Sequence, residues 1–73
     1  MFYVVRDTNY PSRTKRESIE THESMDDAYR SLGQHAVTLH RQGFTVAWWP
    51  GRPVFVATAP DGNSSVDMYV REA

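Results

Sequence analysis

Alternating apolar and polar residues dominate the last third of the chain and predict three β-strands, over residues 44–49, 53–59 and 65–71. Two turn signals separate these segments, Pro50–Gly51 and Asp61–Gly62. Proline followed by glycine favours a tight turn, and Asp-Gly between two apolar runs is a strong hairpin signal. The pattern therefore predicts an antiparallel meander of three strands.

The middle of the chain changes to helical spacing. Ser24 is a suitable N-cap, Arg41 falls in the last turn and Gly43 supplies the C-terminal stop. We therefore predict one helix near residues 24–42, with an apolar stripe on one side. The stripe consists of Met25, Ala28, Tyr29, Leu32, Ala36 and Leu39.

The N-terminal segment is less regular. Residues 2–7 are aromatic and β-branched and predict a strand that is apolar on both faces, so we expect cover on both faces. Residues 8–16 contain turn formers and predict a loop. Residues 17–22 alternate weakly and either form a second strand or lead into the helix.

Strand register decides which side chains share a face. We expect Trp49 opposite Arg52 across the first turn and Pro60 opposite Asn63 across the second, because one face then becomes wholly apolar. That face should pack on the helix stripe. It carries Phe44, Val46, Trp48, Phe55, Ala57, Val66, Met68 and Val70.

The opposite face of the meander, called the outer face below, receives the alternate residues. They are Thr45, Ala47, Trp49, Val54, Val56, Thr58, Asp67, Tyr69 and Arg71. Trp48 should therefore lie in the core and its neighbour Trp49 on the outer face. The same register pairs Arg52 with Arg71, so aromatic and arginine side chains gather at one end of this face.

The predicted fold is a single α+β domain over residues 1–73, with elements in the order ββαβββ. A small antiparallel sheet combines an N-terminal strand or hairpin with the meander, and one α-helix packs on one face. The 73-residue chain has no cysteine, which excludes disulfides and thiolate metal sites. Domains of this size have marginal cores, so self-association is an expected means of stabilisation.

Charge and hydropathy limit the classes of partner. The formal net charge is −1, whereas a chain that binds nucleic acid through bulk charge is strongly basic. No long apolar run is present, so we expect no signal peptide, no membrane association and a cytoplasmic location. Seven of the eight basic residues are arginine, which indicates a GC-rich genome.

The aromatic and arginine cluster on the outer face has three interpretations. It is covered by the N-terminal loop or the C-terminal tail, it is a protein interface, or it is a stacking platform for single-stranded nucleic acid. Tryptophan, tyrosine and arginine are enriched at interface hot spots, which favours a self-dimer or another protein partner. The predicted partner-binding residues are Trp49, Arg52, Val54, Tyr69 and Arg71.

Basic residues also gather in the predicted loop. Arg13, Lys15 and Arg16 could contact phosphate groups or an acidic partner, although a solvated loop is the commoner explanation of such a run.

No catalytic, cofactor-binding or metal-binding residue is predicted. His35 and His40 lie five residues apart on the helix, whereas helical zinc pairs need a spacing of four. His22 belongs to no recognisable triad. The segment Asn63–Ser65 matches a glycosylation sequon, but hairpin-turn chemistry explains it better.

The sequence therefore predicts a small non-enzymatic protein-interaction or regulatory module that binds through the outer face and forms a homodimer. Phage and mobile elements encode many accessory proteins of this size, and such an origin is expected by analogy. The alternative is a nucleic-acid-binding domain that combines the same aromatic residues with the basic segment 6–16.

Overall fold

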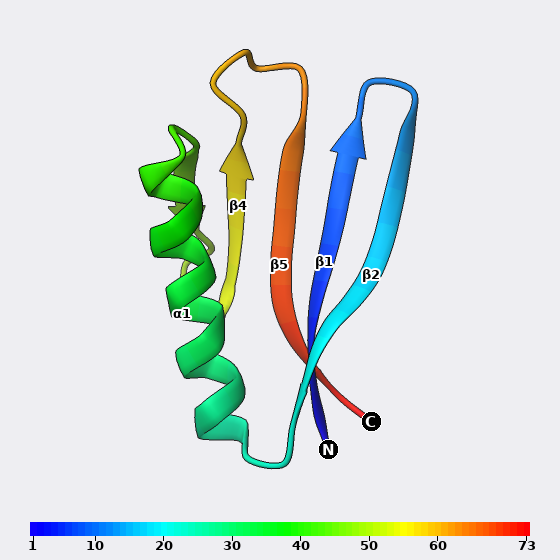
Figure 1. Ribbon diagram of the computed structural model, residues 1–73, viewed down its shortest axis with the longest axis vertical. Helices are drawn as coiled ribbons and strands as arrows, with labels where there is room; N and C mark the ends of the chain where they lie inside the picture. The colour runs from blue at the N-terminus through cyan, green and yellow to red at the C-terminus, as the bar shows by residue number, and fades with distance from the viewer.

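The computed structural model describes all 73 residues and shows five antiparallel strands with one helix packed on them (Figure 1). The strand order across the sheet is β2-β1-β5-β4-β3. The predicted α+β class and the order ββαβββ are confirmed. The elements are β1 (Phe2–Tyr10), β2 (Arg13–His22), α1 (Met25–Arg41), β3 (Thr45–Trp48), β4 (Val54–Thr58) and β5 (Ser65–Glu72).

The prediction of a loop over residues 8–16 is wrong. Strands β1 and β2 form a long hairpin in which Tyr10 pairs with Arg13 and Phe2 with His22, so only a tight turn separates them. Turn-forming residues such as Asn9 and Thr14 lie within the strands, where Thr14 Oγ1 donates to Asn9 Oδ1 at 3.1 Å. Pairing along the sheet overrides their local preference for turns. Of the two interpretations of residues 17–22, the structure shows the strand, because these residues belong to β2.

The helix begins and ends as predicted. Ser24 Oγ accepts a hydrogen bond from the Asp27 N–H at 3.4 Å, and Gly43 takes a positive φ of 92° directly after the helix. The Phe44 N–H donates to the Leu39 carbonyl at 3.0 Å, which closes the last turn and directs the chain into β3. Met25, predicted in the apolar stripe, lies in the first turn and is 47% exposed.

The core lies between α1 and the sheet. Phe55 and Met68 from the sheet and Leu32 from the helix are almost completely buried. Val4 of β1 joins them because it pairs with Val70 of β5. The full buried cluster is Val4, Ala28, Leu32, Ala36, Leu39, Phe55, Ala57, Val66 and Met68.

The register of the meander is partly as predicted. Val54 pairs with Tyr69, which the Pro60–Asn63 alignment requires. In the first hairpin, however, Trp48 pairs with Phe55, a shift of two residues from the predicted pairing of Trp49 with Arg52. A shift of two leaves every side chain on its predicted face, because side chains alternate with a period of two.

Trp48 does not lie in the core as predicted. Its ring contacts Phe55, with centroids 5.1 Å apart, yet the residue is 48% exposed. Strand β3 is an edge strand, so one flank of the indole has no neighbouring strand. Both tryptophans of the pair are therefore half-exposed, on opposite faces of β3.

A β-bulge in the β1–β2 hairpin sets the orientation of the end of β2. Val4 pairs with Glu20 but the next residue, Val5, pairs with Ser18, so Ile19 is an extra residue without a partner. A bulge of this kind changes which face the following side chains point to. Here it places Glu20 and His22 on the face that packs against α1.

Candidate functional site

The outer face has no second layer over it. The only helix packs on the opposite face, all five strands belong to one sheet, and the C-terminal segment is itself strand β5 (Figure 1). The interpretation that the N-terminal loop or the C-terminal tail covers this face is therefore wrong. Val5 on the outer face is nevertheless only 1% exposed, so its neighbours within the sheet are enough to bury it.

The register places four side chains of the outer face in one row across the sheet. The Trp49 N–H donates to the Val54 carbonyl at 2.8 Å, Val54 pairs with Tyr69, and Tyr69 pairs with Val5. Trp49 is 50% exposed, and Val54 and Tyr69 are half-buried. We call Trp49, Val54 and Tyr69 the aromatic row.

A tight turn fixes the end of the row at Trp49. The Arg52 N–H donates to the Trp49 carbonyl at 3.2 Å, and Gly51 between them has a φ of 70°. Proline at position 50 and a glycine with positive φ at 51 are the residues that a type II turn requires. The sequence therefore holds Trp49 at the last position before the turn.

Arginines lie beside the aromatic row. Arg71 pairs with Tyr3 across strands β5 and β1, and its guanidinium lies 6.0 Å from the centre of the Tyr3 ring. Arg52 lies in the turn and is exposed; the pairing of β4 with β5 ends at Val54, so Arg52 has no strand partner. Neither arginine takes part in an ion pair. Four of the five predicted partner-binding residues thus share one face, and Arg52 borders it.

Alternation along β2 places the predicted basic residues 13–16 on opposite faces of the sheet. Arg16 lies on the outer face, where its guanidinium binds both oxygens of the buried Asp7 side chain at 2.9 and 3.1 Å. The hydrogen bond to Asp7 raises the pKa of Arg16. On the other face, Arg13 lies 5.1 Å from the centre of the Tyr10 ring and Lys15 Nζ lies 3.9 Å from Glu17.

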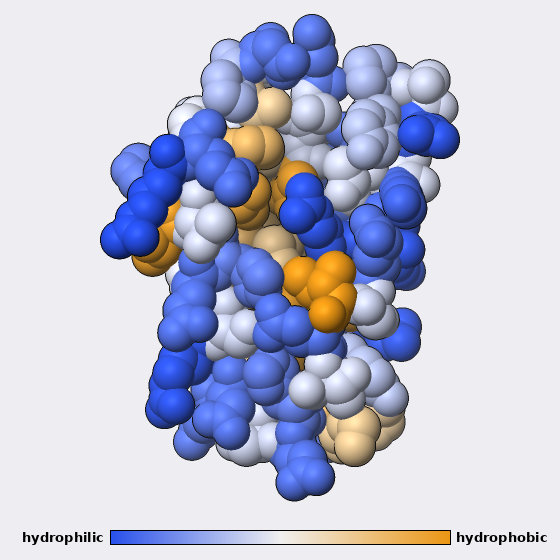
Figure 2. Space-filling model, viewed as in Figure 1, coloured by the Kyte–Doolittle hydropathy of each residue, from blue (hydrophilic) through white to orange (hydrophobic).

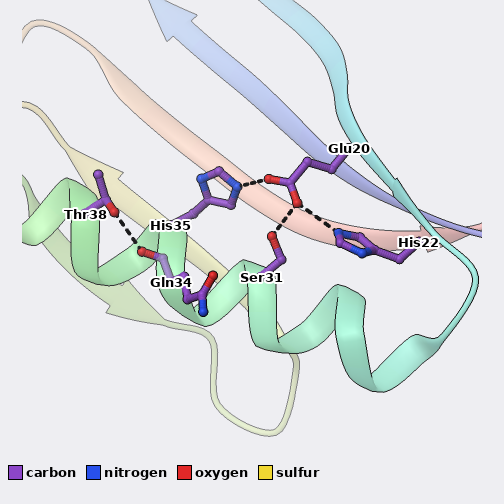
Figure 3. Close-up of polar contacts among 6 residues, drawn as sticks. All are labelled: Glu20, His22, Ser31, Gln34, His35 and Thr38. Atoms are coloured by element: carbon purple, nitrogen blue, oxygen red, sulfur yellow. Dashed lines mark hydrogen bonds and ion pairs between the residues drawn. The ribbon is translucent and has the colours of Figure 1, made fainter.

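A polar cluster that the sequence analysis missed joins β2 to α1 (Figure 3). The carboxylate of Glu20 accepts a hydrogen bond from Ser31 Oγ, contacts His35 Nε2 and lies 2.9 Å from His22 Nε2. The hydrogen bond from Ser31 is the main reason that the pKa of Glu20 is lowered to about 2, with the two histidines contributing further. The positions are far apart in sequence, and only the bulge at Ile19 turns Glu20 towards the helix.

The cluster borders a polar groove between α1 and β2. Figure 2 shows this side of the molecule as mainly hydrophilic, with its most prominent hydrophobic side chains in the hollow between the helix and the hairpin. The groove has a volume of about 500 Å³ and no hydrophobic lining residue. It is lined by Glu20, His22, Asp27, Arg30, Ser31, Gln34, His35 and Thr38.

The geometry of the cluster favours a structural role over a catalytic one. A nucleophilic serine needs a histidine base beside it, but here the carboxylate stands between Ser31 and the histidines. A carboxylate with a pKa of about 2 is also a weak base. No group of three or more histidine, aspartate or glutamate side chains is arranged to hold a metal ion.

No known protein family, curated protein or solved structure matches this chain. No helix is long and apolar enough to cross a membrane. The candidate site therefore rests on the geometry of the outer face.

Proposed function

We propose that the protein is a small non-enzymatic interaction module whose outer face binds another protein. The observation that carries this proposal is the aromatic row, which spans three neighbouring strands on a face that no element of the chain covers. Large aromatic side chains on a rigid sheet lose little conformational freedom when they bind. They are therefore well suited to anchor a partner.

The arginines indicate the chemistry of that partner. Arg52 and Arg71 carry no ion-pair partner and lie along one side of the row, Arg52 near Trp49 and Arg71 near Tyr69. A partner surface with an apolar centre and acidic groups at its rim would complement this arrangement. Electrostatic complementarity of this kind contributes to specificity and to the rate of association.

Two features weigh against the alternative, a nucleic-acid-binding domain. The basic residues Arg13, Lys15 and Arg16 do not form one surface, and Arg16 is engaged by Asp7. The outer face also carries Asp67 directly opposite Asp7. Arg16 neutralises the buried Asp7, but the Asp67 carboxylate carries no ion-pair partner and would repel a phosphate backbone.

Photo-crosslinking tests the proposal directly. A photoreactive phenylalanine derivative replaces Tyr69 in one variant and Val37 in a control, because Val37 is 51% exposed on the helix, away from the outer face. Illumination in the cells that naturally produce the protein should give a discrete protein adduct from position 69 and none from position 37. Adding Arg71→Glu to the position-69 variant should reduce the adduct several-fold.

The opposite results would overturn the proposal. They are an adduct from position 37 but not from position 69, or equal adducts from both positions. An adduct from position 69 that is unchanged by Arg71→Glu would contradict the acidic character assigned to the partner.

A further inference from the structure

The two edges of the sheet differ in charge. Strand β2 forms one edge and has charged side chains along its length, including Arg13, Arg16 and Glu17. Strand β3 forms the other edge, with the sequence Thr-Val-Ala-Trp, and has neither a charge nor a proline. Charges and prolines are two of the devices that prevent an edge from pairing with another strand. Only β3 lacks them.

We propose that β3 pairs antiparallel with β3 of a second copy of this chain, joining two sheets into one continuous sheet. This inference goes beyond the proposed function, because it concerns the edge of the sheet and does not depend on what binds the outer face. It gives the expected self-association a definite surface.

The backbone of β3 provides the hydrogen-bonding groups for this pairing. The Trp49 N–H points inward to Val54, and hydrogen-bonding direction alternates along an antiparallel strand. Thr45 and Ala47 therefore also point their peptide groups towards β4, whereas Val46 and Trp48 point theirs outward. A second β3 strand could form about four hydrogen bonds with these outward groups.

The side chains of β3 are complementary to themselves when Ala47 lies on the two-fold axis. Val46 then lies opposite Trp48 of the second copy, and Thr45 lies opposite its Trp49. Aromatic residues opposite β-branched residues form favourable cross-strand pairs. The small Ala47 meets its own equivalent at the non-hydrogen-bonded position, where the two strands are closest.

The same arrangement accounts for both exposed tryptophans. Trp48 is 48% exposed on the helix side of β3, and Trp49 is 50% exposed on the outer face. A second β3 strand would contact both indoles at once, whereas a partner on the outer face alone would reach only Trp49. The two-fold axis runs perpendicular to the sheet, so both helices stay on one side and both outer faces on the other.

Charge at position 47 provides the test. Ala47 is exposed, so Ala47→Lys should leave the fold intact, but it places two ammonium groups together on the two-fold axis. Thr58→Lys is the matched control, because Thr58 is exposed on the same face of the neighbouring strand β4. Sedimentation equilibrium, with circular dichroism as the check on folding, should show a wild-type dimer. Its dissociation constant should rise at least tenfold in Ala47→Lys and stay unchanged in Thr58→Lys.

Mixing variants identifies the contact itself. Ala47→Asp should also associate weakly alone, but an equal mixture of Ala47→Lys and Ala47→Asp should form a mixed dimer. Amide exchange gives a second measurement: the Val46 and Trp48 amides should exchange more slowly as the protein concentration rises. The Ala47 amide, already bonded to β4, should change least.

Three results would overturn the pairing: a monomeric wild type at all concentrations, an Ala47→Lys protein that dimerises as the wild type does, or a mixture that gives no mixed dimer. None of them bears on the crosslink at Tyr69, which lies two strands from the edge. Conversely, a dimer that depends on position 47 without a crosslink at position 69 would keep the edge pairing and reject the proposed function.

Discussion

At the scale of single residues, Glu20 ties the end of β2 to the helix. Its carboxylate accepts hydrogen bonds from side chains on both elements, and its pKa falls from an ordinary value of 4.5 to about 2. A carboxylate whose pKa is lower in the folded state stabilises the fold above its unfolded pKa. That contribution is lost as the pH falls through the folded value.

We therefore expect an acid-dependent stability that Glu20→Gln removes. Between about pH 5 and pH 2.5, the wild type should lose about 1–2 kcal/mol more unfolding free energy than Glu20→Gln, a figure reduced for the partial exposure of the side chain. Urea unfolding at the two pH values measures this difference.

Glu17→Gln is the matched control for this experiment, because Glu17 lies on the same strand and the same face but its carboxylate makes only one ion pair, at 3.9 Å with the exposed Lys15. Its pH dependence should follow the wild type within about 0.5 kcal/mol. If Glu17→Gln and Glu20→Gln behave alike, the role assigned to Glu20 is wrong.

At the scale of elements, two glycines near the helix should respond oppositely to alanine. Gly33 lies within α1, and a Cβ added there meets no atom within 4 Å. Gly33→Ala should stabilise the protein by about 0.5–1 kcal/mol and raise the midpoint of thermal unfolding by about 4 °C. Gly43→Ala should lower it, because Gly43 has a φ of 92° and the new Cβ would lie 3.2 Å from Pro60 Cγ.

Differential scanning calorimetry on both variants measures these shifts. A lower midpoint for Gly33→Ala, or no loss for Gly43→Ala, would contradict the helix geometry described above. The prediction does not depend on any partner.

The elements also show where sequence patterns are sufficient to predict secondary structure. The helix and the meander could be predicted because their apolar residues repeat at spacings of three and four, or two, with clear turn and cap residues. The hairpin over residues 8–16 could not be predicted, because its residues are mostly polar. Residues 8–10 form strand structure by pairing with β2 and β5, and residues 13–16 by pairing with β1.

The two candidate sites also differ in how far the sequence predicts them. The partners of the aromatic row follow from alternation and from one hairpin register, so four of the five residues could be placed on one face in advance. The Glu20 cluster depends on a bulge at Ile19, for which the sequence has no local signal. Regular alternation from Glu17 would have put Glu20 on the outer face.

At the scale of the whole molecule, edge pairing would link stability to concentration. Because only the folded chain can form the proposed dimer, dimerisation stabilises the native state by mass action. The midpoint of thermal unfolding of the wild type should therefore rise with protein concentration, whereas that of Ala47→Lys should not. Calorimetry at several concentrations of each protein tests this, and a wild-type midpoint independent of concentration would contradict it.

The charged edge at β2 would then limit how large the proposed assembly becomes. A sheet in which both edges can pair with further strands could add copies indefinitely and grow into a fibre, as open head-to-tail contacts do. If β3 is consumed in the proposed pair, both remaining edges are formed by β2, and each would present charged side chains that include Arg13, Lys15 and Glu17. Charged side chains along an edge disfavour pairing with a further strand, so the proposed assembly would stop at two copies.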